Sequence, residues 1–260
     1  RQFIFRMREF EQMEMQFFVR PGEQKKWYEY WKDFRMKWHQ AIHPSKKLQF
    51  HDHEKLAFYA DAALDIEFEF PFGFRELEGI HSRTNHDLNA HQELSGRKLQ
   101  YFDPELKESY VPYVVETSIG VDRMFLATMA NALVEETVPN ADGKDSTRTV
   151  LRVHPALAPI KCAVLPLVKN NEEFTSKARE IFNHIKYSFE CQYDEKDSPG
   201  KRYRRQDAIG TPYCITIDGQ TLEDNTVTIR DRDTMEQTRI VIDNIEKVVL
   251  EKINMRHLLK

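Results

Sequence analysis

Polar residues in the segment Tyr113–Leu133 stand where they could bind a ligand. The first part of this segment alternates with the period of a strand, so that Glu116 and Ser118 share one face. Gly120 ends the alternation. The pattern therefore predicts a strand with a polar face that ends at a glycine turn.

The residues after Gly120 predict a buried helix with a charged first turn. From Val121 onward the segment is almost wholly apolar, with charge only at Asp122 and Arg123. Asp122 suits a helix N-terminus, whereas a cation there opposes the helix macrodipole. A residue that breaks a local rule is expected to serve a ligand. Arg123 therefore predicts an anionic ligand, and the alternative is a core helix whose arginine faces water.

A second alternating pattern lies near the start of the chain. Apolar and polar residues alternate strictly over Phe10–Val19, which predicts a strand. Its polar face presents Gln12, Glu14 and Gln16. This face either contacts water or contacts a ligand, and the pattern alone leaves both possibilities open.

Four strings resemble segments of one enzyme family, in collinear order over essentially the whole chain. ETSIGVDR (116–123), with the apolar helix after it, resembles motif 3 of class II aminoacyl-tRNA synthetases, in the variant typical of glycyl-tRNA synthetases. RMREFEQMEMQFFV (6–19) resembles the latter half of motif 2. GFRELEGIHSRTNHDLNAH (73–91) is similar to a segment in which an acid and the next residue contact ATP. GKRYRRQDAIGTP (200–212) resembles the anticodon-binding domain.

The resemblance implies a role for each matching residue. The cations expected to act in catalysis are Arg6, Arg8 and Arg123. ATP contacts are expected at Phe5, Arg6, Met7, Arg8, Glu9, Phe10, Glu76, Leu77, Gly120, Val121, Asp122 and Arg123. Glycine contacts are expected at Phe10, Glu11, Gln12, Met13, Glu14, Glu116, Thr117, Ser118, Ile119 and Gly120. Contacts with tRNA are expected at Lys201, Arg202, Arg204 and Arg205.

The implied activity is that of a glycine–tRNA ligase. Glycine would react with ATP, accompanied by Mg²⁺, to give glycyl-adenylate, and the glycyl group would move to tRNA(Gly). The metal ligands are not identified by the sequence. The alternative is a non-catalytic accessory subunit that resembles these synthetases and binds nucleic acid. The presence of Arg6, Glu76 and Arg123 favours the enzyme.

Motif 1 and the first strand of motif 2 have no counterpart in this sequence. We therefore expect a C-terminal fragment from motif 2 onward, inactive alone, of a protein that is a homodimer at full length. Residues 1–137 would be a partial catalytic domain with an antiparallel sheet, 138–157 a linker, and 158–260 a small α/β anticodon-binding domain. The first part of the linker, 138–148, is rich in Pro, Gly, Asn and Asp, and an exposed insert is the alternative there. The expected fold class is α+β followed by α/β.

Composition limits the environment of the protein. The net charge of -4 over 260 residues gives no overall basic signal, so contacts with nucleic acid must come from local patches. The three cysteines, Cys162, Cys191 and Cys214, form no CxxC pair, so we expect neither a disulfide framework nor zinc. No apolar run reaches the ~20 residues of a membrane span. A cytoplasmic protein that does not contact a membrane is expected.

The remaining patterns predict secondary structure and weaker sites. A second helix is predicted over His51–Leu64, and Thr234 could cap another. Glu76 and Glu78 are predicted to share one strand face. The segment 196–212 is predicted to be a basic loop in which Tyr203 could stack on unpaired bases, and solvated charge is the alternative.

Overall fold

The computed structural model describes residues 3–139, 143 and 145–259. The chain divides into two compact units, Arg1–Asn131 and Ala132–Lys260. The mixed fold class predicted from the sequence is confirmed, because an antiparallel sheet precedes a small α/β unit. None of the helices in the described part of the chain has the length and apolar composition that a membrane span requires.

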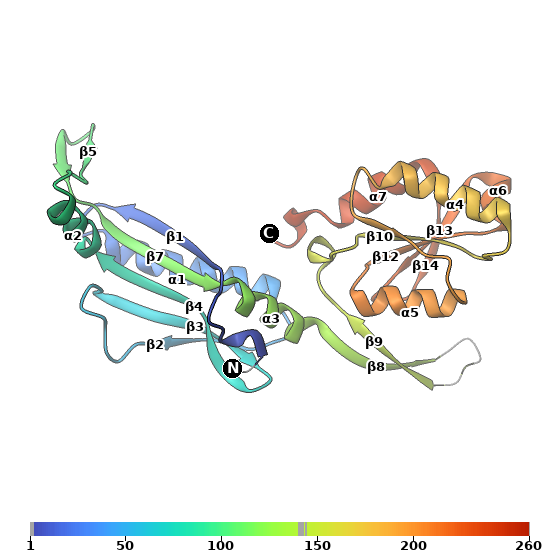
Figure 1. The fold of residues 1–260 in the computed structure, drawn as a ribbon, viewed down its shortest axis with the longest axis horizontal. Coiled ribbons are helices and arrows are strands. Elements are labelled where there is room, and N and C mark those ends of the chain that lie inside the picture. Colours follow the sequence, from blue (N-terminus) through green and yellow to red (C-terminus); the bar gives the residue numbers. More distant parts are fainter. Residues whose placement is uncertain (1–2, 140–142, 144, 260) are drawn as a thin grey trace. The chain divides into compact units, whose positions relative to one another are not determined.

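The first unit is built on a five-stranded antiparallel sheet with the strand order β1-β7-β4-β3-β2 (Figure 1). Its other elements are two longer helices, a polar helix with no buried residue, a short hairpin and a single 3-10 turn. Their bounds are η1 (Phe3–Phe5), β1 (Gln12–Val19), α1 (Gln24–Ile42), β2 (Leu48–Asp52), β3 (Ala62–Phe70), β4 (Gly73–Thr84), α2 (His86–Ser95), β5 (Tyr101–Asp103), β6 (Glu108–Tyr110), β7 (Tyr113–Gly120) and α3 (Val121–Ala132).

Helix α1 covers one face of this sheet (Figure 1). The opposite face carries mainly polar side chains on β1 and β7. The buried Tyr28 and Met36 of α1 pack against apolar residues of the strands, among them Ile66, Ile80 and Val115. Because side chains alternate along each strand, the residues between these apolar ones face away from the helix. Glu116 and Ser118 lie on that opposite face, as predicted.

Two local predictions in the first unit are wrong. The segment His51–Leu64 is not a helix, because its ends belong to β2 and β3, which pair antiparallel with His51 opposite Asp65. The helical spacing there was coincidental, and the alternation of Ala62–Phe70 decides the structure through pairing with β4. Glu76 and Glu78 do not share a face either, because a bulge separates them: Glu67 opposes Glu76 while Ile66 opposes Glu78.

The second unit is a five-stranded mixed sheet with helices on both faces, preceded by a hairpin. The strand order is β11-β10-β12-β13-β14, with β10 parallel to β11 and β12 and the remaining pairs antiparallel. The bounds are β8 (Leu133–Pro139), β9 (Asp145–Leu151), η2 (Pro155–Leu157), β10 (Cys162–Pro166), α4 (Glu172–Ile185), β11 (Cys191–Tyr193), α5 (Pro199–Ile209), β12 (Tyr213–Ile217), α6 (Gly219–Asp224), β13 (Thr226–Asp231), β14 (Gln237–Val241), η3 (Ile242–Asn244), α7 (Ile245–Lys252) and η4 (Met255–His257).

Alternation along β10 explains why both faces of this sheet are covered. Cys162 and Val164 pack with α4 and α7, whereas Ala163 and Leu165 pack with Tyr203 of α5. Figure 1 accordingly shows α4 and α7 on one side of the sheet and α5 on the other.

Three predictions in the second unit differ from the structure. The expected linker, 138–157, contains all of β9, which pairs antiparallel with β8. Both strands are rich in the β-branched residues Thr and Val, which favour extended structure. The expected basic loop is mostly helix α5, which begins after Ser198 with Pro199 in its first turn. Thr234 lies in the connection between β13 and β14 and caps no helix.

Candidate functional site

A pocket of about 170 Å³ lies in the first unit where β7 ends and α3 begins. It contains residues from the segment before β1, from β4, and from the β7–α3 junction. The residues that line it are Ile4, Phe5, Arg6, Met7, Phe10, Gln12, Glu76, Ser118, Gly120, Asp122 and Arg123. The structure therefore brings together residues that the sequence placed in three separate motifs.

Arg123 lies in the first turn of α3 and is held by contacts that use two of its three nitrogen atoms. Its Nε donates to the carbonyl oxygen of Phe5 at 3.2 Å, and its Nη1 donates to that of Glu76 at 3.2 Å. The same Nη1 lies 3.0 Å from Oε2 of Glu76, and the guanidinium stacks 4.4 Å from the centre of the Phe5 ring. None of these contacts involves Nη2. A guanidinium fixed in this way can donate to an anion in the pocket.

The segment before β1 supplies one side of the pocket. Phe5 is buried, with its ring centre 5.2 Å from that of Phe70 and 5.3 Å from that of Phe72. This packing anchors the segment, and Phe10 at its other end remains 60% exposed. An exposed aromatic ring beside a pocket can stack on a planar ligand such as a purine base. Met7 and Arg6 also line the pocket, whereas Arg8 and Glu9 are exposed and do not.

The polar face of the sheet supplies the other side. Nε2 of Gln12 donates to Oγ of Ser118 at 3.3 Å, and that hydroxyl donates to Oε1 of Glu14 at 3.3 Å. The three residues come from β1 and β7, in which Glu14 directly opposes Ser118. Oxygen acceptors gathered in this way can hold an ammonium group.

Glu116 lies on the same face, two residues before Ser118 along β7 and further from the pocket. Its carboxylate accepts hydrogen bonds from Nε2 of Gln16 at 2.6 Å and from Nη1 of Arg83 at 3.1 and 3.2 Å, and Nδ1 of His81 lies 3.6 Å away. Burial alone would raise the pKa of Glu116, but these three neighbours outweigh it and lower the pKa to about 2. The carboxylate is therefore ionised at every physiological pH.

Arg83 was not singled out in the sequence. Besides Glu116, it bonds Asp87 at 2.9 Å and lies 4.2 Å from the centre of the Tyr59 ring. The spacing of Arg83 and Asp87 suits an ion pair within a helix, but β4 ends at Thr84, so the pair joins a strand to a helix. Only the pairing of β4 with β7 brings Arg83 to Glu116, and that pairing leaves no local signal.

Some predicted contact residues turn their side chains away from the pocket. Leu77, Thr117 and Ile119 are almost completely buried, and Leu77 and Ile119 belong to one apolar cluster. Met13 lies on the same side of β1 as Met15 and opposite to Glu14. Only backbone atoms of such residues could reach a ligand on the polar face.

The junction residues have mainly backbone roles. The N–H of Val121 donates to the carbonyl oxygen of Glu11 at 2.9 Å, which ties the start of α3 to the start of β1. Gly120 and Asp122 line the pocket. No group of three or more His, Cys, Asp or Glu residues in the described ranges could hold a metal ion.

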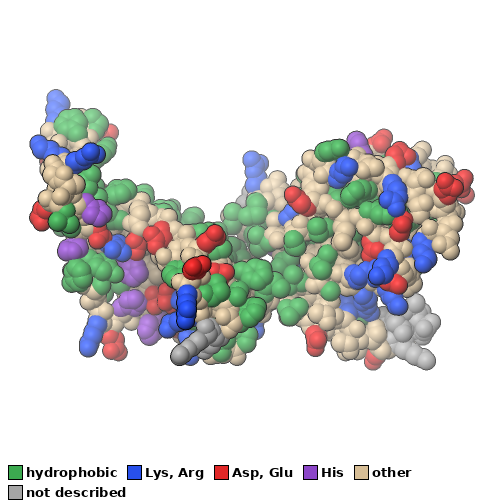
Figure 2. Space-filling model, viewed as in Figure 1, with side chains coloured by type: hydrophobic (Ala, Val, Ile, Leu, Met, Phe, Trp, Pro, Cys, Tyr) green, Lys and Arg blue, Asp and Glu red, His purple; other side chains and the backbone are tan. Residues whose placement is uncertain are grey.

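The basic residues of α5 in the second unit, unlike Arg123, do not line this pocket. Arg202 is 1% exposed, and its three guanidinium nitrogen atoms donate to the carbonyl oxygens of Pro166, Lys196 and Asp197. Its side chain is thus closed off from a ligand, whereas Lys201 is exposed. On the face that Figure 2 shows, Lys and Arg side chains lie beside Asp and Glu side chains in both units.

The other predicted tRNA contacts on α5 also have protein partners. Nη2 of Arg204 donates to Oγ of Ser146 at 2.8 Å. Arg205 bonds the carboxylates of Asp194 at 2.8 Å and Asp197 at 2.9 Å. These arginines are half-buried, so only part of each is accessible.

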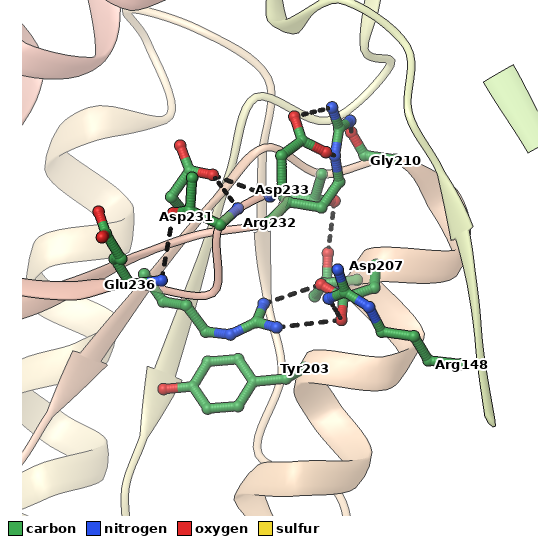
Figure 3. Close-up of polar contacts among 12 residues, drawn as sticks. Arg148, Tyr203, Asp207, Gly210, Asp231, Arg232, Asp233 and Glu236 are labelled. Atoms are coloured by element: carbon green, nitrogen blue, oxygen red, sulfur yellow. Dashed lines mark hydrogen bonds and ion pairs between the residues drawn. The ribbon is translucent and has the colours of Figure 1, made fainter. Parts of the chain in front are cut away.

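Asp207 is the centre of a buried charge cluster that holds α5 in place (Figure 3). It accepts hydrogen bonds from Nη1 of Arg148 at 2.9 Å and from Nη1 of Arg230 at 2.8 Å. The guanidinium of Arg230 stacks 4.7 Å from the centre of the Tyr203 ring, whose hydroxyl bonds Thr216 at 2.6 Å. Tyr203 therefore faces the sheet and does not offer its ring to an unpaired base.

Comparison with known proteins gives two results. Residues 161–252 match the family described as "Anticodon binding domain". The chain is 51% identical over 254 residues to "Glycine--tRNA ligase" of Staphylococcus epidermidis, covering 96% of this chain and 54% of the relative. It is 51% identical to "Glycine--tRNA ligase" of Clostridium tetani and 50% identical to that of Staphylococcus aureus, covering 96% of this chain and 53% of each relative. The chain thus spans about half the length of the curated relatives it matches.

Proposed function

We propose that this chain takes part in joining glycine to tRNA(Gly). The premise is that the chain belongs to the glycine–tRNA ligase family and spans about half the length of its members. A carboxylate oxygen of glycine would attack the α-phosphorus of ATP, the bond to pyrophosphate would break, and glycyl-adenylate would form. A ribose hydroxyl of tRNA would then attack the glycyl carbonyl and release AMP. No protein nucleophile is needed, so positioning and charge stabilisation supply the catalysis.

The observation that carries this proposal is the pocket in which Arg123 meets the polar end of β7. We assign Arg123 to the phosphates of ATP, with Arg6 beside it and Phe10 against the adenine ring. The expected contacts of Arg8 and Glu9 need the segment before β1 to close over the nucleotide. Mg²⁺ binds through one or two carboxylates together with phosphate oxygens, and Glu76 is a pocket carboxylate that could supply one ligand.

Glycine would occupy the polar face beside this nucleotide. Glu14, Glu116 and Ser118 would bind its ammonium group and fill the space next to Cα. A pocket that is already filled rejects larger amino acids by steric exclusion. Selectivity for glycine would then need no editing site, because no smaller amino acid exists.

The division into domains follows the same proposal. Residues 1–137 would form part of the catalytic domain and 158–260 the anticodon-binding domain that contacts tRNA(Gly). Lys201 is the residue of α5 best placed for a phosphate, because it is exposed. The full-length protein would be a homodimer.

The test is glycine-dependent exchange of labelled pyrophosphate into ATP. It should be run on this chain and on a polypeptide that extends it to the length of its relatives. Exchange with glycine, but not with alanine or serine, is expected from the longer polypeptide. If that polypeptide folds and binds nucleic acid but gives no exchange, the proposal is wrong and the non-catalytic accessory subunit is the better account.

Ser118→Gly tests the steric basis of selectivity. Removal of this side chain opens space beside the proposed position of Cα, so alanine-dependent exchange should appear. We expect the ratio of glycine to alanine exchange to fall by about tenfold, since one methyl group in a pocket is worth about 1–3 kcal/mol. Glycine selectivity that stays at the wild-type level would contradict this geometry. Ser82→Gly, on the helix-covered face, is the matched control.

A further inference from the structure

Glu78 is a buried carboxylate that the pocket does not use. It lies on β4 and is completely buried beneath α1. It accepts hydrogen bonds from Nε of Arg35 at 2.6 Å and from Nε2 of His39 at 2.6 Å, both on α1. Buried ion pairs often add no stability relative to apolar residues of similar volume. A contribution to stability is therefore not a sufficient reason for a charge at this position.

The bulge in β4 places Glu78 on the helix-covered side. Ile66 opposes Glu78 and Glu67 opposes Glu76, so Leu77 is an extra residue between two paired ones. Leu77 is 1% exposed and packs with Phe68. Leu77 and Glu78 thus both point toward the buried side of the sheet, although they are consecutive.

Glu76 consequently points to the opposite face. Its side chain is half exposed and lines the pocket, with Oε2 3.0 Å from Nη1 of Arg123 and its carbonyl oxygen 3.2 Å from the same atom. In a strand without the bulge, Glu76 and Glu78 would share one face. One of these two acids would then lose its partners.

We infer that Glu78 is a positioning residue: its bonds to Arg35 and His39 hold the bulge in β4, which turns Glu76 toward Arg123. Helix α1, on the opposite face of the sheet, thereby positions the guanidinium of Arg123 in the pocket. The consequence for ATP rests on the proposed function, whereas the link between Glu78 and Arg123 does not.

The link can be measured in the 260-residue chain labelled with ¹⁵N. The reporter is the Nε–H signal of Arg123, identified by its loss in Arg123→Lys. Glu78→Leu removes the acceptor for both α1 donors, and Arg35→Met removes one of these donors while keeping an unbranched apolar side chain against Trp38. Both variants should shift or broaden the Arg123 signal. Glu78→Gln, which keeps an acceptor oxygen, should restore it toward the wild-type position.

Glu67→Gln is the matched control, because Glu67 opposes Glu76 across the strands but bonds only Gln49 on the exposed face. It should leave the Arg123 signal unchanged. An unchanged Arg123 signal in folded Arg35→Met and Glu78→Leu would overturn the inference. An equal shift in Glu67→Gln would also overturn it, because any change near Glu76 would then suffice.

Titration of the same proteins with ATP and Mg²⁺ extends the test to the pocket. We expect Glu78→Leu to weaken ATP binding by about tenfold, as for other residues that orient a binding group. If the wild-type chain binds no ATP, the assignment of the nucleotide to this pocket fails. The arginine signal still decides the positioning role in that case.

Discussion

Arg123 and Arg202 were both expected from the sequence to contact a ligand, yet the two units surround them differently. Arg202 is 1% exposed and donates from all three nitrogen atoms to backbone carbonyl oxygens. Arg123 lines a pocket, and its contacts with Phe5 and Glu76 use only Nε and Nη1. An arginine whose donors are all taken by the backbone supports the fold. One with a donor left over in a pocket is available to a ligand.

The same difference separates the central carboxylates of the two units. Asp207 is closed between Arg148 and Arg230 inside its unit, whereas Glu116, although only 7% exposed, lies on the sheet face opposite α1, on the same face as Ser118, which lines the pocket. Both are paired with arginine. The surroundings of the pair, and not the pair itself, distinguish a structural charge from a site.

The largest expected effect is that of Asp207→Ala. This change leaves the buried guanidinium of Arg230 without a carboxylate and leaves Arg148 with Glu136 alone, which should lower the free energy of unfolding of the second unit by about 3–5 kcal/mol. Urea unfolding followed by circular dichroism measures the loss. All three tryptophans, Trp27, Trp31 and Trp38, lie in α1, so tryptophan fluorescence follows the first unit separately.

Asp194→Ala is the control for that experiment. Asp194 bonds Arg205, whose side chain is 40% exposed, and accepts from the N–H of Lys196, so its loss should cost about 1 kcal/mol, well below the loss for Asp207→Ala. If Asp194→Ala and Asp207→Ala destabilise the chain equally, the buried cluster has no special role.

The next effect concerns the pH dependence of stability in the first unit. The pKa of Glu116 is lowered from its ordinary value of 4.5 to about 2 in the folded chain. The unfolded chain therefore takes up this proton first, and the stabilisation by Glu116 is complete above pH 4.5 and is lost as the pH falls toward 2. The difference in unfolding free energy between wild type and Glu116→Gln should decline by up to about 3 kcal/mol over this range.

Arg83→Met sharpens that measurement. Removal of the guanidinium should raise the pKa of Glu116 and reduce the decline. A decline that is the same with and without Arg83 would show that the hydrogen bond from Gln16 and the proximity of His81 dominate instead.

The smallest expected effect is on the proposed contact of α5 with tRNA(Gly). Lys201 is exposed, so Lys201→Ala should weaken binding of tRNA(Gly) a few-fold, by about 1 kcal/mol, and reduce the salt dependence by about one phosphate contact. Arg205→Ala should weaken binding less, because Asp194 and Asp197 already neutralise this cation. Filter binding at two salt concentrations compares the two variants. A larger loss for Arg205→Ala would contradict the structural role of these pairs.

The elements that could be predicted from the sequence are those with a local pattern of polar and apolar residues. The structure has strands at the segments with Glu14, Glu116 and Ser118 and a helix that begins at Val121, as predicted. These predictions succeeded because the alternation of polar and apolar residues is visible in consecutive positions. The bulge at Leu77 was missed, since it depends on pairing with β3.

The function of the basic segment was harder to predict, because some partners of its arginines are distant in sequence and others are backbone carbonyl oxygens. Arg202 bonds Pro166, and Arg204 bonds Ser146. No local pattern shows such contacts. Charge in a sequence therefore predicts a basic surface only when the fold leaves that charge exposed.

The most direct test of this account compares Arg123→Lys with Arg202→Lys in the polypeptide extended to the length of its relatives. Lysine keeps the charge but cannot reproduce the contacts of a guanidinium. Arg123→Lys should reduce glycine-dependent pyrophosphate exchange by about 10²-fold and lower the free energy of unfolding by less than about 1 kcal/mol, because the contacts it loses with Phe5 and Glu76 are partly exposed. Arg202→Lys should lower that free energy by about 2 kcal/mol and leave exchange per folded molecule unchanged. Loss of exchange in a stable Arg202→Lys, or full exchange in Arg123→Lys, would contradict the account.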